Sequence, residues 1–83
     1  MSTKEEIGHS TFEVEGVLPV FKMRIFRDVI DHPGATAKQI RTRLAGDGVN
    51  LHKKVVNKVL YAALSHKQMS RVDTGKAPQW HAA

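Results

Sequence analysis

The chain has 83 residues, a length that allows one small domain rather than two. It contains no cysteine, which excludes disulfides, thiolate zinc sites and cysteine nucleophiles. No apolar run approaches the roughly 20 residues that a membrane-spanning helix needs, and no stretch has the pattern of a signal peptide. We therefore expect an intracellular protein of the cytoplasm or nucleus, with no membrane among its partners.

The formal net charge of +5 is unevenly distributed along the chain. Residues 1–16 hold one lysine against four glutamates, a net charge of −3, so the remaining 67 residues carry +8. A basic surplus of this kind is typical of proteins that bind polyanions. A solvated basic face without any partner is the plainer alternative, so the charge favours a nucleic-acid partner without requiring one.

Residues 1–16 are polar and show no sustained period, which predicts a flexible or loosely ordered N-terminal segment and leaves residues 17–83 for the folded domain. Pro19 can open a first helix, because the N–H that proline lacks would have no partner there. Pro33 ends this helix by disfavouring helical geometry at the residue before it. The apolar side chains of the helix recur at helical spacing and predict one buried stripe. They are Phe21, Ile25 and Val29, flanked by Phe26 and Ile30.

Two further helices are predicted before residue 66. Thr36 can cap the second helix, and the glycines of residues 46–48 stop it. Asn50 or a neighbour can cap the third helix, which is predicted to run to about His66. Both helices have apolar side chains at helical spacing. These are Ala37, Ile40 and Leu44 in the second helix, with Lys38, Arg41 and Arg43 outward, and Val56, Val59, Leu60, Ala63 and Leu64 in the third.

The C-terminal part of the chain predicts a β-hairpin. Residues 69–73 favour a short strand, residues 74–78 a turn and residues 79–82 the returning strand. Three helices followed by a hairpin is the order of an α+β winged helix-turn-helix domain, which has a further short strand after its first helix. We therefore expect the order helix, strand, helix, helix, strand, strand, with the C-terminal hairpin as the wing. Because a fold does not fix a function, the exposed face of the third helix must decide it.

The third helix carries a line of polar and aromatic side chains on a face away from its apolar stripe. Lys53, Asn57 and Tyr61 follow one another at intervals of four residues, with Lys54 and Lys58 nearby. Lysines neutralise phosphates, an asparagine amide both donates and accepts hydrogen bonds, and an aromatic ring can stack on a base. The alternative is that Tyr61 completes the core beneath the wing and Asn57 is merely solvated.

Trp80 is the only tryptophan, and it lies on the predicted returning strand. It can fill the core between wing and helices, which is the commoner fate of a lone tryptophan. It can also brace the ring of Tyr61. The two roles are compatible, so both are expected.

The run from Lys53 to Tyr61, together with Ala77-Pro78-Gln79-Trp80, resembles the Zα family of winged-helix domains. These domains bind left-handed Z-form DNA and RNA. The family pattern is a basic residue, an asparagine four residues later, a tyrosine four residues after that, and a proline-bearing wing that ends in tryptophan, and all four features are in register here. The resemblance covers about residues 20–82. It implies a module of an innate-immune sensor, of an editing enzyme or of a viral antagonist of these proteins.

The resemblance also implies a role for individual residues. Asn57 would bind backbone phosphate directly and through water, and Tyr61 would pack against a guanine in the syn conformation. Trp80 would support Tyr61 edge-to-face and reach a phosphate-bound water. Lysines would contact phosphates, and the proline would press the wing against the backbone. The complete set of expected binding residues is Lys53, Lys54, Asn57, Lys58, Tyr61, Lys76, Ala77, Pro78 and Trp80.

Four features depart from the usual family pattern. Ala77 stands where the wing usually carries the first of two adjacent prolines, and Lys76 replaces a small hydroxyl residue. The connection from Leu44 to Lys53 is longer than in the usual member, and the polar segment 1–16 has no counterpart in the minimal domain. The first two departures weaken the apolar contact of the wing and substitute a charged one.

By the resemblance, the function is conformation-specific and largely independent of sequence. Binding the Z form more tightly than the right-handed form shifts B-form DNA or A-form RNA toward Z by mass action. The family also allows two copies of the domain on one duplex. An ordinary winged-helix regulator of B-DNA and a protein–protein adapter are the two alternatives.

An enzyme is not expected from this sequence. The five histidines include no pair at the spacing of metal ligands on a helix. The single Gly-x-Gly, at residues 46–48, lies between helices and lacks the strand and third glycine of a nucleotide-binding loop. We therefore expect a binding module with no catalytic residues, no cofactor and no metal.

Overall fold

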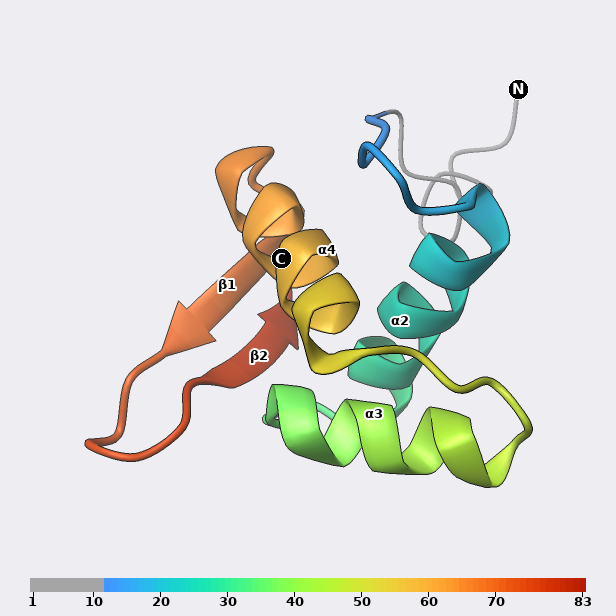
Figure 1. Ribbon diagram of the computed structural model, residues 1–83. Coiled ribbons are helices and arrows are strands. Elements are labelled where there is room, and N and C mark those ends of the chain that lie inside the picture. Colours follow the sequence, from blue (N-terminus) through green and yellow to red (C-terminus); the bar gives the residue numbers. More distant parts are fainter. Residues whose placement is uncertain (1–11) are drawn as a thin grey trace.

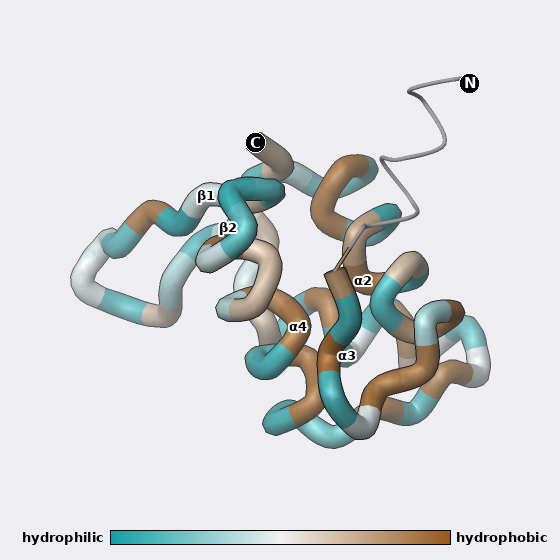
Figure 2. Tube along the Cα trace, turned by 90° about the horizontal axis from the view of Figure 1, so that it is seen from above, coloured by the Kyte–Doolittle hydropathy of each residue, from teal (hydrophilic) through white to brown (hydrophobic). Residues whose placement is uncertain are grey.

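The computed structural model describes residues 12–83, which form three helices and a two-stranded antiparallel hairpin. The helices pack together, and the hairpin projects to one side of them (Figure 1). Seen from above, the loop of the hairpin again extends away from the helices, and it is mostly hydrophilic or neutral (Figure 2). This α+β arrangement is compatible with a winged helix. The elements are α2 (Pro19–Asp31), α3 (Ala37–Gly46), α4 (Lys53–Ser65), β1 (Met69–Val72) and β2 (Gln79–Ala82).

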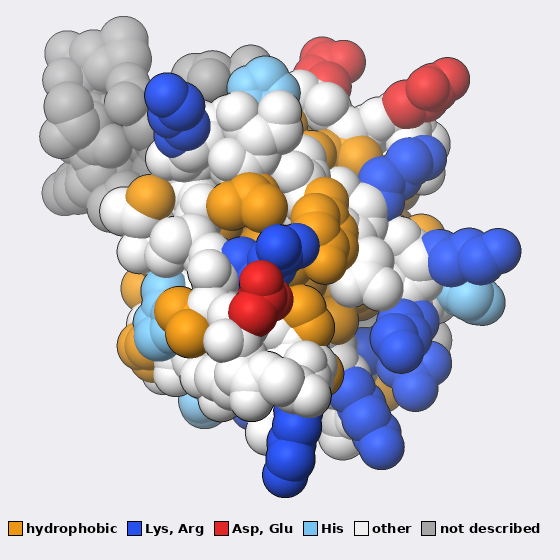
Figure 3. Space-filling view, turned by 90° about the vertical axis from the view of Figure 1, so that its left-hand side faces the viewer, with side chains coloured by type: hydrophobic (Ala, Val, Ile, Leu, Met, Phe, Trp, Pro, Cys, Tyr) orange, Lys and Arg blue, Asp and Glu red, His pale blue; other side chains and the backbone are white. Residues whose placement is uncertain are grey.

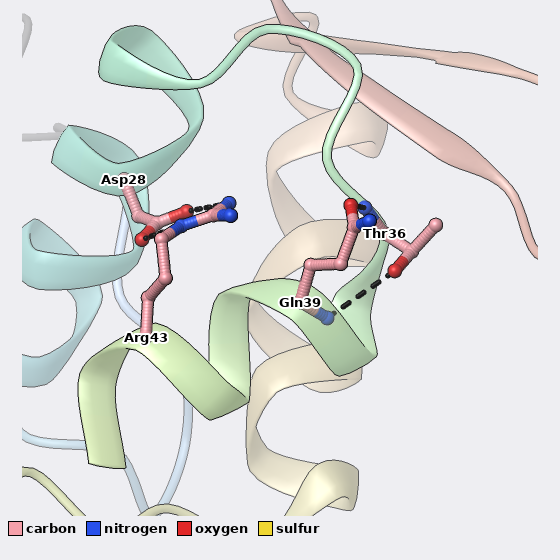
Figure 4. A network of polar contacts seen from close by, with 4 residues as sticks. All are labelled: Asp28, Thr36, Gln39 and Arg43. Atoms are coloured by element: carbon pink, nitrogen blue, oxygen red, sulfur yellow. Dashed lines mark hydrogen bonds and ion pairs between the residues drawn. The ribbon is translucent and has the colours of Figure 1, made fainter. Parts of the chain in front are cut away.

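The helices begin and end close to the predicted residues. Pro19 lies in the first turn of α2. Thr36 caps α3 in a capping box, in which its Oγ1 accepts from the Gln39 N–H at 3.2 Å and its own N–H donates to Gln39 Oε1 at 3.0 Å (Figure 4). The N-cap of α4 is His52, whose Nδ1 accepts from the Lys54 N–H at 3.0 Å. None of the helices in the described part of the chain is both long and apolar enough to cross a membrane.

The core is formed by the inward stripes of the three helices, closed on one side by Trp80. Most of the predicted stripe residues are buried, while Phe21, Ile30 and Leu64 are only half-buried. The fully buried apolar side chains at the centre are Ile25, Val29, Ile40, Val56, Val59, Leu60 and Ala63.

The segment before α2 contributes to this core. Phe12 and Val14 are both 7% exposed. The Phe12 ring stacks on His66 at 4.3 Å between centroids, and Lys22 Nζ donates to the Phe12 carbonyl oxygen. Phe12 and Val14 were predicted to lie in the flexible lead-in, whereas the structure buries both of them in the core. The rest of that expected flexible segment, residues 1–11, lies outside the described residues.

The described residues contain two strands, β1 and β2. The prediction of a further strand between the first two helices is wrong. Ala35 forms only an isolated bridge with Trp80 there. The Ala35 carbonyl accepts a hydrogen bond from the backbone N–H of Trp80 at 2.9 Å, and the Gly34 N–H donates to the backbone carbonyl of Trp80 at 2.8 Å. Only a few residues separate the end of α2 from the Thr36 cap of α3, which leaves no length for a strand. The bridge nevertheless fixes β2 to the corner between these two helices.

An ion pair joins α2 to α3. Arg43 donates from Nε and from one terminal nitrogen to the two carboxylate oxygens of Asp28, at 2.9 and 2.8 Å (Figure 4). Asp28 is buried, and the bond to its carboxylate raises the pKa of the Arg43 guanidinium. Arg43 was predicted to point outward with the other basic residues of this helix, whereas it lies against α2 in the ion pair with Asp28.

Candidate nucleic-acid interface

The exposed face of α4 carries the side chains that the sequence analysis selected. Because α4 turns Val56, Val59, Leu60 and Ala63 into the core, the opposite side faces solvent. Figure 3 shows Lys and Arg side chains along two borders of the hairpin side of the molecule, with few acidic ones among them. The expected binding residues of α4 are all exposed or half-exposed: Lys53, Lys54, Asn57, Lys58 and Tyr61.

Tyr61 and Trp80 form the aromatic centre of this face. Their ring centroids lie 5.1 Å apart with an interplanar angle of 86°, an edge-to-face contact. Trp80 is 1% exposed and held by the Ala35 bridge, whereas Tyr61 is 42% exposed. Tyr61 therefore does not complete the core beneath the hairpin; it presents part of its ring to solvent over a fixed indole. Trp80 both fills the core and braces Tyr61, as expected.

Arg71 is a residue of this face that the sequence analysis did not select. One terminal nitrogen of its guanidinium donates to Tyr61 Oη at 3.2 Å, and the guanidinium carbon lies 5.5 Å from the centre of the Tyr61 ring. The other terminal nitrogen pairs with Asp73 at 3.2 Å. The Tyr61 hydrogen bond, and then the charge of Asp73, raise the pKa of the Arg71 guanidinium. The hairpin register could have revealed it, since Arg71 is directly opposite Trp80.

Lys58 is already engaged in the protein. Its Nζ donates to the backbone carbonyl oxygen of Glu15 at 2.8 Å. This contact fastens the segment before α2 to the outer side of α4 and brings the acidic end of that segment near the basic helix. An ammonium has three N–H donors, so two remain for a ligand. Lys53 and Lys54, in the first turn of α4, are exposed.

The predicted residues of the hairpin loop lie apart from this centre. Lys76 and Ala77 are exposed in the loop between β1 and β2, and Pro78 is half-buried just before β2. Within residues 12–83, no hydrogen bond or ion pair joins this loop to α4. The structure thus brings Tyr61 and Trp80 into contact and leaves the loop residues free to approach a ligand from the side.

Comparisons of the chain with protein-family models, with curated proteins and with solved structures found no match. The likeness to the Zα family thus consists of the residues and spacings given above.

Proposed function

We propose that this chain is a winged-helix domain that binds left-handed Z-form DNA or RNA through α4 and the hairpin. The observation that carries the proposal is the half-exposed Tyr61 ring held edge-on by the buried Trp80. A solvent-facing aromatic ring on a rigid support is a stacking surface for a base. Asn57 and Lys53 precede it by one and two helical turns, where a phosphate backbone would run.

The composition of this face supports recognition of shape rather than of sequence. Its polar groups are mainly lysines and one asparagine amide, which suit phosphates. Among the described residues of this face, the one long side chain able to read a base edge in pairs is Arg71, which is held against Tyr61 and Asp73. A fixed surface of this kind selects a backbone path and a base posture. The domain therefore acts by binding alone, with no catalytic step, cofactor or metal.

Selective binding converts a duplex by mass action. Moving an equilibrium from about 1:99 to 99:1 requires roughly ten-thousand-fold tighter binding to the favoured form, which is about 5.5 kcal/mol. When several domains bind one duplex, for example two copies side by side, their preferences for the Z form add up to this free energy. Each copy then needs only a moderate preference for the Z form.

Circular dichroism of an alternating CG duplex, titrated with the protein, tests the proposal. We expect the long-wavelength bands to invert as protein is added. A duplex of the same length without alternating purines and pyrimidines is the control, since it converts poorly. Tight binding with unchanged right-handed bands would replace the proposal by an ordinary B-DNA regulator. No binding at physiological salt would favour a protein–protein adapter with a solvated basic face.

A further inference from the structure

Arg71 is the basic side chain most closely tied to Tyr61. It lies on β1, outside the set of residues that the Zα resemblance assigns. It hydrogen-bonds the phenol oxygen at 3.2 Å and holds its charge 5.5 Å from the ring centre. Any ligand that stacks on Tyr61 therefore meets this guanidinium.

The hairpin register explains why the contact forms. Arg71 pairs with Trp80 across the β1–β2 ladder. Residues directly opposite in an antiparallel pair project from the same face of the sheet. The indole and the guanidinium thus leave the hairpin on the same side, and Tyr61 of α4 contacts both.

The guanidinium has unused capacity for an anion. It carries five N–H donors, of which the contacts to Tyr61 and Asp73 use two. Its planar fork matches the oxygens of a phosphate. The Asp73 carboxylate is exposed, and exposed ion pairs contribute little to stability, so an incoming phosphate can replace it at small cost.

We propose that Arg71 is a phosphate-binding residue of the hairpin, which exchanges Asp73 for a backbone phosphate next to the base on Tyr61. Its bond to the Tyr61 hydroxyl orients the ring in both states. This inference rests on the proposed function and deepens it, because it makes β1, as well as the hairpin loop, part of the interface. Asp73 acts as the internal anion that occupies the site in the free protein.

Binding to a chemically Z-locked CG duplex over a series of salt concentrations tests the assignment. The loss of one phosphate contact makes the negative slope of log K against log salt shallower by about 0.9. The affinity deficit of Arg71→Ala should therefore shrink by about threefold between roughly 50 and 200 mM salt. Arg71→Gln keeps an amide donor near Tyr61 but has no charge, so its slope should be shallower by the same amount as that of Arg71→Ala. Arg24→Ala, in the depression between α2 and α3, is the matched control and should keep the wild-type slope.

Asp73→Asn supplies the opposite perturbation. Without the competing carboxylate, the variant should bind the Z-locked duplex several-fold more tightly than the wild type. Melting curves of all variants establish that they are folded at the assay temperature. A slope unchanged in Arg71→Ala and Arg71→Gln overturns the Arg71 assignment, even if affinity falls, because Arg71 would then only support Tyr61. Failure of the wild-type protein to bind the Z-locked duplex overturns the proposed function itself.

Discussion

Replacing Tyr61 by alanine removes the ring on which the proposed interface is centred. The ring is 42% exposed, and its main aromatic contact is the edge-to-face one with Trp80. Such a contact contributes about 0.5–1.5 kcal/mol to stability, which corresponds to a fall in melting temperature of about 2–12 °C for a domain of this size. A base stacked on the ring contributes about 1–3 kcal/mol to binding, or about 5- to 150-fold in Kd.

The assay is the Kd for a Z-locked CG duplex, measured well below the melting temperature of the variant. The fluorescence of the single tryptophan supplies the signal, because Trp80 lies directly beneath the ring. Tyr61→Phe keeps the ring and should retain most of the affinity. Val20→Ala, which trims another exposed apolar side chain on α2, should bind like the wild type. An unchanged Kd in folded Tyr61→Ala would refute the stacking role.

Three further perturbations separate binding from stability. Lys53→Ala should lower the salt slope of binding by about 0.9, whereas Lys67→Ala, beyond the other end of α4, should not; equal slopes would exclude a phosphate contact at Lys53. Phe12→Ala should cost about 3 kcal/mol of unfolding free energy or more in a thermal melt, and a loss below about 1 kcal/mol would show that the segment before α2 is not part of the core. Asp28→Ala should cost about 2 kcal/mol by leaving Arg43 without its partner, with an unchanged Kd for the Z-locked duplex.

The helices of this chain could be predicted because their signals are local. Pro19 sets the first turn of α2, and Thr36 with Gln39 forms a capping box within four residues of sequence. The apolar period then identifies the buried side of each helix. The start of α4 was less sharply defined, since the sequence offered Asn50 or a neighbour as its cap. In the structure the cap is His52, whose Nδ1 accepts from the Lys54 N–H.

The contacts that the sequence did not predict join residues distant along the chain. Arg43 belongs to a basic helix face by its spacing, yet it pairs with Asp28 of the preceding helix. Phe12 lies in a polar segment without any period, and its partner His66 is at the far end of α4. Arg71 meets Tyr61 only because the hairpin folds back beside α4. Periodicity carries no information about such pairs, which depend on register and on the crossing of elements.

The bridge between Ala35 and Trp80 has a consequence for the energetics of association. The backbone N–H and the backbone carbonyl of Trp80 are both hydrogen-bonded to the corner between α2 and α3. The stem of the hairpin is therefore held in place in the free protein, together with the indole that supports Tyr61. A preorganised surface loses little conformational entropy on complex formation, which leaves more of each contact's free energy as affinity.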